Sequence, residues 1–85
     1  MKILFSKQAK KDLVKMRGSG SVALKAAKLL DIIKVNPFQN PPPYEKLCGD
    51  LEGYYSRRIN RQHRLVCRIV GDEIWVVSMW THYDF

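Results

Sequence analysis

The order of apolar and turn-forming residues predicts an α+β domain with the element order β-α-α-β-β-β. Two amphipathic segments joined by Gly18-Ser19-Gly20 indicate a helical hairpin, and three alternating segments follow a proline-rich stretch. We expect the helical hairpin to pack on one side of a mostly antiparallel four-stranded sheet. With 85 residues, the chain is long enough for one domain, residues 1–85, and too short for a second.

The N-terminal half supplies one strand and the helical hairpin. Residues 2–5 are an apolar segment of strand length, and Ser6 is a favourable N-cap for a helix over residues 7–17. Apolar residues at helical spacing predict a second helix over residues 22–35. Asn36-Pro37 ends it, because proline disfavours helical geometry in the residue before it.

The C-terminal half supplies three strands after a loop over residues 37–53. Four prolines make that loop either a stiff connector or a rigid frame for Glu45. Strands are predicted over residues 54–60, 63–70 and 74–83, with Gly71-Asp72 as the hairpin turn between the last two.

Strand alternation predicts which side chains share a face, because residues i and i+2 point to the same side. The residues expected to face the helices are Ile59, Leu65, Cys67, Ile69, Trp75, Val77 and Met79. The residues expected on the uncovered face are Tyr54, Ser56, Arg58, Asn60, Arg64, Val66, Arg68, Ser78, Trp80 and His82. The uncovered face therefore combines cations with aromatic rings, which is typical of surfaces that hold single-stranded nucleic acid.

The net charge supports a polyanionic partner. Fifteen Lys and Arg residues against eight Asp and Glu residues leave a formal charge of +7. RNA cleavage by its own 2′-hydroxyl requires a base, cations at the phosphate and an acid for the leaving oxygen. His82 is suited to be the acid, and Glu45 is one of the few carboxylates beside the basic face.

Other chemistries have little support. The two cysteines, Cys48 and Cys67, are expected to be free thiols with packing roles, and His63 is expected to order the start of its strand. No closely spaced pair of metal ligands exists, so we expect no metal and no cofactor. No apolar run reaches the roughly 18–20 residues of a membrane-spanning helix, and no signal peptide is apparent, so we expect a cytoplasmic protein without a membrane partner.

Several short motifs occur in a specific order along the chain: Asn36-Pro37-Phe38, Tyr44-Glu45-Lys46-Leu47, Leu51-Glu52-Gly53-Tyr54-Tyr55-Ser56-Arg57-Arg58-Ile59, His63-Arg64-Leu65-Val66 and His82-Tyr83. Together they resemble the Txe/YoeB toxins of the RelE/ParE superfamily. The resemblance spans nearly the whole chain. It implies the RelE-like microbial ribonuclease fold and the toxin of a type II toxin–antitoxin system, which cleaves mRNA on the ribosome without metal and leaves a 2′,3′-cyclic phosphate.

The same resemblance implies roles for individual residues. Glu45 matches the general base, His82 the general acid and Arg64 the arginine that stabilises the phosphate. The residues expected to bind substrate are Arg58, Tyr83, Lys46 and Arg57. The implied partners are a cognate antitoxin with an acidic tail, the ribosome with its mRNA, operator DNA only as the toxin–antitoxin complex, and a second copy in a homodimer.

The chain departs from the family pattern at three places. Cys48 stands where the family usually has a lysine, and Lys46 is the neighbouring cation that could replace it. Pro41-Pro42-Pro43 replaces a glycine-lysine stretch, and Asp84-Phe85 follows the usual terminal tyrosine. Two alternatives stay open: a non-enzymatic toxin like the gyrase-inhibiting branch of the superfamily, and a simple nucleic-acid-binding module.

Overall fold

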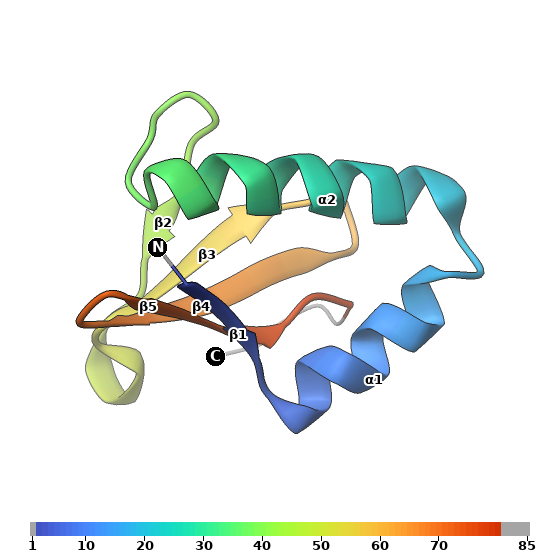
Figure 1. Ribbon diagram of the computed structural model, residues 1–85. Coiled ribbons are helices and arrows are strands. Elements are labelled where there is room, and N and C mark those ends of the chain that lie inside the picture. Colours follow the sequence, from blue (N-terminus) through green and yellow to red (C-terminus); the bar gives the residue numbers. More distant parts are fainter. Residues whose placement is uncertain (1, 81–85) are drawn as a thin grey trace.

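The computed structural model describes residues 2–80 and shows two helices with a five-stranded sheet (Figure 1). The elements are β1 (Lys2–Phe5), α1 (Lys7–Met16), α2 (Gly20–Val35), β2 (Glu45–Lys46), a 3₁₀ turn (Gly49–Leu51), β3 (Tyr54–Arg58), β4 (Arg64–Val70) and β5 (Glu73–Ser78). The strand order is β1-β5-β4-β3-β2, with β1 parallel to β5 and the other pairs antiparallel. The α+β class and the helical hairpin are thus confirmed.

The prediction of four strands was wrong by one. β2 has only two residues, Glu45 and Lys46, and lies inside the proline-rich loop. No alternation of apolar and polar residues in this loop predicts a strand. It forms because Glu45 and Lys46 pair with Ser56 and Tyr55 of β3. This short edge strand fixes where Glu45 lies on the sheet.

The helix boundaries follow local signals. The Ser6 hydroxyl accepts a hydrogen bond from the Ala9 N–H at 3.0 Å and donates one to the Val77 carbonyl at 2.7 Å. The predicted N-cap therefore also joins the start of α1 to β5. α2 lies across one face of the sheet, whereas α1 contacts the β5–β1 edge and α2 (Figure 1).

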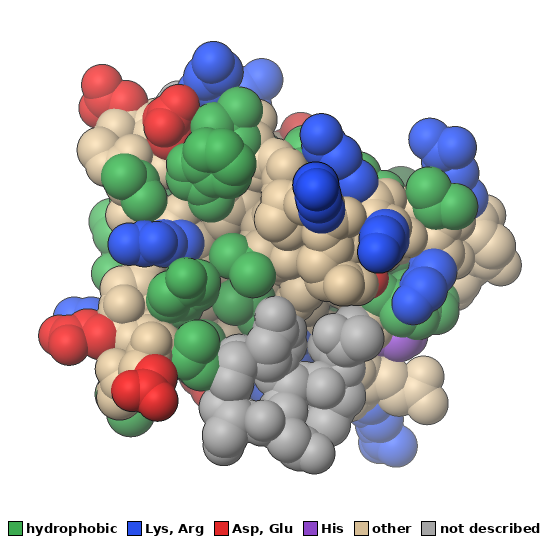
Figure 2. Space-filling model, turned by 90° about the horizontal axis from the view of Figure 1, so that it is seen from below, with side chains coloured by type: hydrophobic (Ala, Val, Ile, Leu, Met, Phe, Trp, Pro, Cys, Tyr) green, Lys and Arg blue, Asp and Glu red, His purple; other side chains and the backbone are tan. Residues whose placement is uncertain are grey.

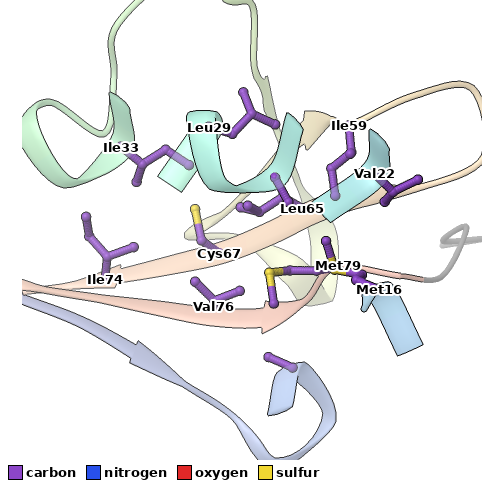
Figure 3. Packing of buried hydrophobic residues seen from close by; sticks show 12 residues of the cluster. Met16, Val22, Leu29, Ile33, Ile59, Leu65, Cys67, Ile74, Val76 and Met79 are labelled. Carbon is purple, nitrogen blue, oxygen red and sulfur yellow. The ribbon is translucent and has the colours of Figure 1, made fainter. Parts of the chain in front are cut away.

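One core fills the space between α2, α1 and the sheet. Figure 3 shows Leu29 and Ile33 of α2 above side chains that rise from the central strands. The buried cluster consists of Ala9, Met16, Val22, Ala26, Leu29, Ile33, Ile59, Leu65, Cys67, Ile74, Val76 and Met79. The predicted core positions Ile59, Leu65, Cys67 and Met79 are confirmed.

The predicted face assignment of β5 was partly wrong. Ile74 and Val76 are fully buried in the core, whereas Trp75, which was expected there, is 37% exposed. Strict alternation fails because β4 and β5 change register: Cys67 pairs with Val76, but the preceding Val66 pairs with Ser78. Val77 is therefore an extra residue in a β-bulge, which brings Ser78 back to the expected face.

The two cysteines have different environments. Cys67 is buried, as expected for a packing residue, whereas Cys48 is exposed, so the packing role expected for Cys48 was wrong. Burial raises the pKa of the Cys67 thiol to about 11, against the opposing effect of the Arg57 charge. The folded protein therefore keeps this proton to higher pH than the unfolded chain does.

This difference predicts two-phase thiol reactivity. With Ellman's reagent at neutral pH, one thiol should react rapidly and the second only in denaturant, since the thiolate is the reactive form. The fast phase should be absent in Cys48→Ser. Two fast thiols in the native protein would contradict this assignment.

The raised pKa of Cys67 also predicts how stability depends on pH. The contribution of Cys67 to the free energy of unfolding should be complete below the pKa of an exposed thiol, about 8.5, and should fall as pH rises toward 11.

Candidate active site on the open face of the sheet

The sheet face opposite α2, here called the open face, carries the candidate site. Cross-strand pairing places Arg58 of β3 beside Arg64 of β4, and Glu45 of β2 beside Ser56 of β3. Four residues pair in turn across β2, β3, β4 and β5, and we call them the central row: Glu45, Ser56, Val66 and Ser78. The pair Arg58–Arg64 flanks one side of this row.

Within residues 2–80, Glu45 and Arg64 form the one ion pair found on this face. Arg64 Nη1 lies 3.7 Å from Glu45 Oε1, with side chains 24% and 69% exposed, respectively. A pocket of about 270 Å³ is lined by Pro43, Tyr44, Glu45, Ser56, Arg58 and Arg64. The structure thus brings together three of the sequence-predicted site residues: Glu45, Arg58 and Arg64.

Arg57 holds the loop that carries Glu45 in place through hydrogen bonds. The Arg57 guanidinium donates hydrogen bonds to the carbonyls of Pro42 at 2.7 Å, Pro37 at 3.0 Å and Gln39 at 3.0 Å. It also lies over the Tyr44 ring, 5.1 Å from the centroid. Burial lowers the pKa of Arg57 from its usual value, while Cys67 and Tyr44 act in the opposite direction.

This placement argues against the expectation that Arg57 binds substrate. Arg57 is only 2% exposed, and strand alternation turns it away from the open face that Arg58 occupies. Its charge holds backbone carbonyls of the proline-rich loop, so we assign it a structural role. Lys46 is exposed, but the same alternation places it on the side opposite Glu45.

The floor of the site is more buried than expected. Val66, predicted to be exposed, is 1% exposed, and Ser56 and Ser78 beside it are 3% and 1% exposed. These short side chains lie between rows of longer ones. The hydroxyls of Ser56 and Ser78 have no hydrogen-bond partner, although most buried polar groups in proteins have one. Ser56 lines the pocket, and its short polar side chain beside two arginines is the signal that the sequence analysis did not use.

Two contacts hold the chain that leads from β5 toward residue 81. The Met79 N–H donates to the buried carboxylate of Asp12 at 3.0 Å. The His63 ring stacks on Trp80, with centroids 4.1 Å apart, and its Nδ1 hydrogen-bonds the Trp80 carbonyl. His63 thus orders more than its own strand. His82 and Tyr83 lie outside the described residues.

Two further features concern metals and membranes. Among residues 2–80, no group of three His, Cys, Asp or Glu side chains is arranged to hold a metal ion. None of the helices in that range is long and apolar enough to cross a membrane.

Known proteins share this fold, and two of those described below also share about a third of the sequence. The YoeB/ParE toxin from Agrobacterium tumefaciens is 31% identical with a TM-score of 0.91, over 98% of this chain and 100% of that chain. YoeB in the YoeB–YefM complex from Staphylococcus aureus is 36% identical with a TM-score of 0.85, over 98% of each chain. Escherichia coli YafQ, at 18% identity and a TM-score of 0.78 over 94% of this chain and 91% of that chain, shares the fold alone.

A sequence relative agrees with the structural ones. Toxin YoeB from Streptomyces coelicolor is 36% identical over 84 residues, which is 98% of this chain and 100% of that protein. Together these likenesses define a toxin of a bacterial type II toxin–antitoxin system. The chain belongs to the family described as YoeB-like toxin of bacterial type II toxin-antitoxin system, which matches residues 5–83.

Proposed function

We propose that this toxin is a ribosome-dependent endoribonuclease that cleaves mRNA and thereby inhibits translation. The observation that carries the proposal is the pocket in which the Glu45 carboxylate faces the Arg64 guanidinium, with Arg58 beside them. A carboxylate beside two cations on an accessible sheet face suits proton abstraction next to a phosphate.

The proposed reaction is a transesterification. Glu45 removes the proton of a ribose 2′-hydroxyl, and the 2′-oxygen attacks the adjacent phosphorus. Arg64 and Arg58 stabilise the negative charge that develops on the phosphate oxygens. The bond to the 5′-oxygen breaks, His82 gives that oxygen a proton, and the products are a 2′,3′-cyclic phosphate and a 5′-hydroxyl. Tyr83 helps to hold the substrate, and the step requires no metal.

The family membership also suggests partners. A structural relative is a YoeB–YefM complex and another is a YoeB dimer, both from Staphylococcus aureus. We propose that a cognate antitoxin covers the open face with an acidic tail, which the net charge of +7 would attract. We further propose that the toxin forms a homodimer, contacts operator DNA only as the toxin–antitoxin complex, and acts in the cytoplasm.

The test is cleavage of a defined mRNA by the purified protein, with and without programmed ribosomes. We expect cuts only on ribosomes, cyclic or 3′-phosphate ends, and no effect of EDTA on a ribosome-free control. A protein that arrests growth but cuts no RNA in either condition would contradict the proposal and direct attention to gyrase or another binding target.

The unpartnered hydroxyl of Ser56 supports a contact with the substrate and gives a specific prediction. In Ser56→Ala, kcat/KM for cleavage should fall roughly 10- to 100-fold, the range expected for losing one hydrogen bond to a charged group. The free energy of unfolding should be unchanged or slightly higher, because a buried hydroxyl without a partner is removed.

Ser78→Ala is the matched control for this prediction. Ser78 is also buried and unpartnered in the central row, but it does not line the pocket. Its removal should leave cleavage near the wild-type rate. Equal losses of activity in both variants would indicate a packing effect rather than a substrate contact at Ser56.

A further inference from the structure

Beyond the pocket, the open face carries a second set of side chains, here called the stacking row: Tyr54, Arg68 and Trp75. Tyr54 of β3 pairs with Arg68 of β4, and Arg68 pairs with Trp75 of β5. Three adjacent strands therefore place a cation directly between two aromatic residues on one face. The sequence alone did not predict this row, because its apolar alternation placed Trp75 in the core.

The stacking row is accessible and partly preorganised. The Arg68 guanidinium lies over the Tyr54 ring, 5.6 Å from its centroid, which is within the range of a cation–π contact. Arg68 is exposed and Trp75 is 37% exposed, whereas the neighbours of Trp75 on β5, Ile74 and Val76, are fully buried. Within residues 2–80, no ion pair joins Arg68 to a carboxylate. An exposed indole adds little to the core, and beside an arginine that no carboxylate of residues 2–80 neutralises it is suited to bind a planar anionic ligand.

The stacking row is continuous with the candidate active site. Tyr54 and Arg68 are each two residues from the central row, at Ser56 and Val66, so one pleat repeat of about 7 Å separates the rows. Figure 2 looks from the side opposite α2 and shows hydrophobic side chains beside Lys or Arg side chains, with most of the visible acidic ones toward the left margin. Beyond the row, the β4–β5 turn carries Asp72 and β5 begins with Glu73, and both carboxylates would repel a phosphate backbone. A polyanion crossing the row would therefore run toward Arg58 and Arg64.

We propose that the stacking row binds a nucleobase of single-stranded RNA next to the cleaved bond, with Arg68 contacting its phosphate. The proposal rests on the proposed function, since it adds a neighbouring nucleotide to the same site. Aromatic rings stack on any base, and arginine contributes both charge and a planar face. The row then positions the RNA strand while Glu45 and the arginines of the pocket act on the phosphate.

The first experiment measures KM and kcat on programmed ribosomes. Trp75→Leu should raise KM about 5- to 100-fold, the range that corresponds to one base–aromatic stack, with a smaller effect on kcat. Trp75→Phe should retain most of the affinity. Leu24→Ala, which truncates an exposed apolar residue on α2 (59% exposed), is the matched control and should leave KM unchanged.

The second experiment locates the stacked base. Messenger RNAs are prepared with a single abasic nucleotide at successive positions around the cut. At one of these positions, the missing base should raise the KM of the wild type by the same factor by which Trp75→Leu raises it on intact mRNA. At that position the abasic site should not raise the KM of Trp75→Leu any further. The proposal would be overturned if Trp75→Leu had the KM of the wild type. It would also be overturned if the abasic nucleotide raised KM by the same factor in the variant and the wild type at every position.

A binding measurement separates this proposal from the proposed function. The protein has two tryptophans, so Trp80→Phe leaves Trp75 as the only indole reporter. Its fluorescence should be quenched by a short single-stranded oligoribonucleotide, whereas Trp75→Phe should show little quenching. Quenching without cleavage would contradict the endoribonuclease but support RNA binding by the stacking row. Cleavage with no quenching, and with a normal KM in Trp75→Leu, would support the endoribonuclease and overturn RNA binding by the row. If Trp75→Leu lost only its binding to an acidic antitoxin peptide, the row would be a protein interface and the proposal would be overturned.

Discussion

Glu45→Gln and His82→Gln are each expected to slow mRNA cleavage on the ribosome by about 10²–10⁴-fold, the usual cost of losing a general base or acid. Glutamine keeps the size and polarity of glutamate but cannot take the 2′-hydroxyl proton. The Glu45–Arg64 pair lies 3.7 Å apart and is largely exposed on the Glu45 side, so it should contribute only about 0–1 kcal/mol to stability. Activity should therefore fall while the melting temperature stays near that of the wild type.

Rates, melting temperatures and antitoxin binding should be measured on the same preparations. Growth arrest should be lost in both variants, and antitoxin binding should remain. Glu52→Gln, an exposed carboxylate in the segment just before β3, serves as the matched control and should cleave at the wild-type rate. If Glu45→Gln or His82→Gln cleaves as fast as the wild type, the corresponding proton-transfer role is wrong.

Arg57→Ala is expected to cause the largest loss of stability, on the order of 3 kcal/mol. Three hydrogen bonds from a charged donor disappear, and the Pro37 carbonyl is left buried without this donor. For a domain of this size, such a loss should lower the melting temperature by roughly 12–24 °C. Cleavage should fall as well, because the loop that Arg57 fastens carries Glu45.

Arg58→Ala is the adjacent control. Arg58 is exposed on the open face, so its removal should change the melting temperature little while lowering cleavage. Arg57→Lys should be intermediate in stability, since a lysine cannot reproduce the planar fork of a guanidinium. A stable Arg57→Ala variant with impaired cleavage would contradict the structural role and restore Arg57 as a substrate-binding residue.

The two neighbouring arginines also show the limit of reasoning from a motif. Both belong to the run Tyr55-Ser56-Arg57-Arg58 that resembles the toxin family, and both were expected to bind substrate, although strand alternation in the sequence predicted only Arg58 on the uncovered face. Once β3 pairs with β4, alternation sends Arg58 to the open face and Arg57 toward the proline-rich loop. The resemblance identified the family correctly. It did not distinguish Arg58, which lines the pocket, from Arg57, which hydrogen-bonds the proline-rich loop.

Trp75 illustrates the same limit in the sheet. Its apolar character and its spacing from Met79 predicted a core position, and only the register change opposite Val66 and Cys67 reverses it. A β-bulge depends on the pairing of two strands, so neither strand contains the information by itself. The stacking row is a consequence of that pairing.

The elements of this protein were determined largely by local sequence: the Ser6 cap, the glycine turn after α1, Asn36-Pro37 and the alternating strands each act through nearby backbone geometry. Tertiary structure alone decided that Glu45 lies on an edge strand beside Arg64, that Ser56 has an unpartnered hydroxyl, and that Arg57 is buried. These features depend on contacts between residues distant in sequence, and such contacts are set by strand register and packing rather than by the preference of any single residue.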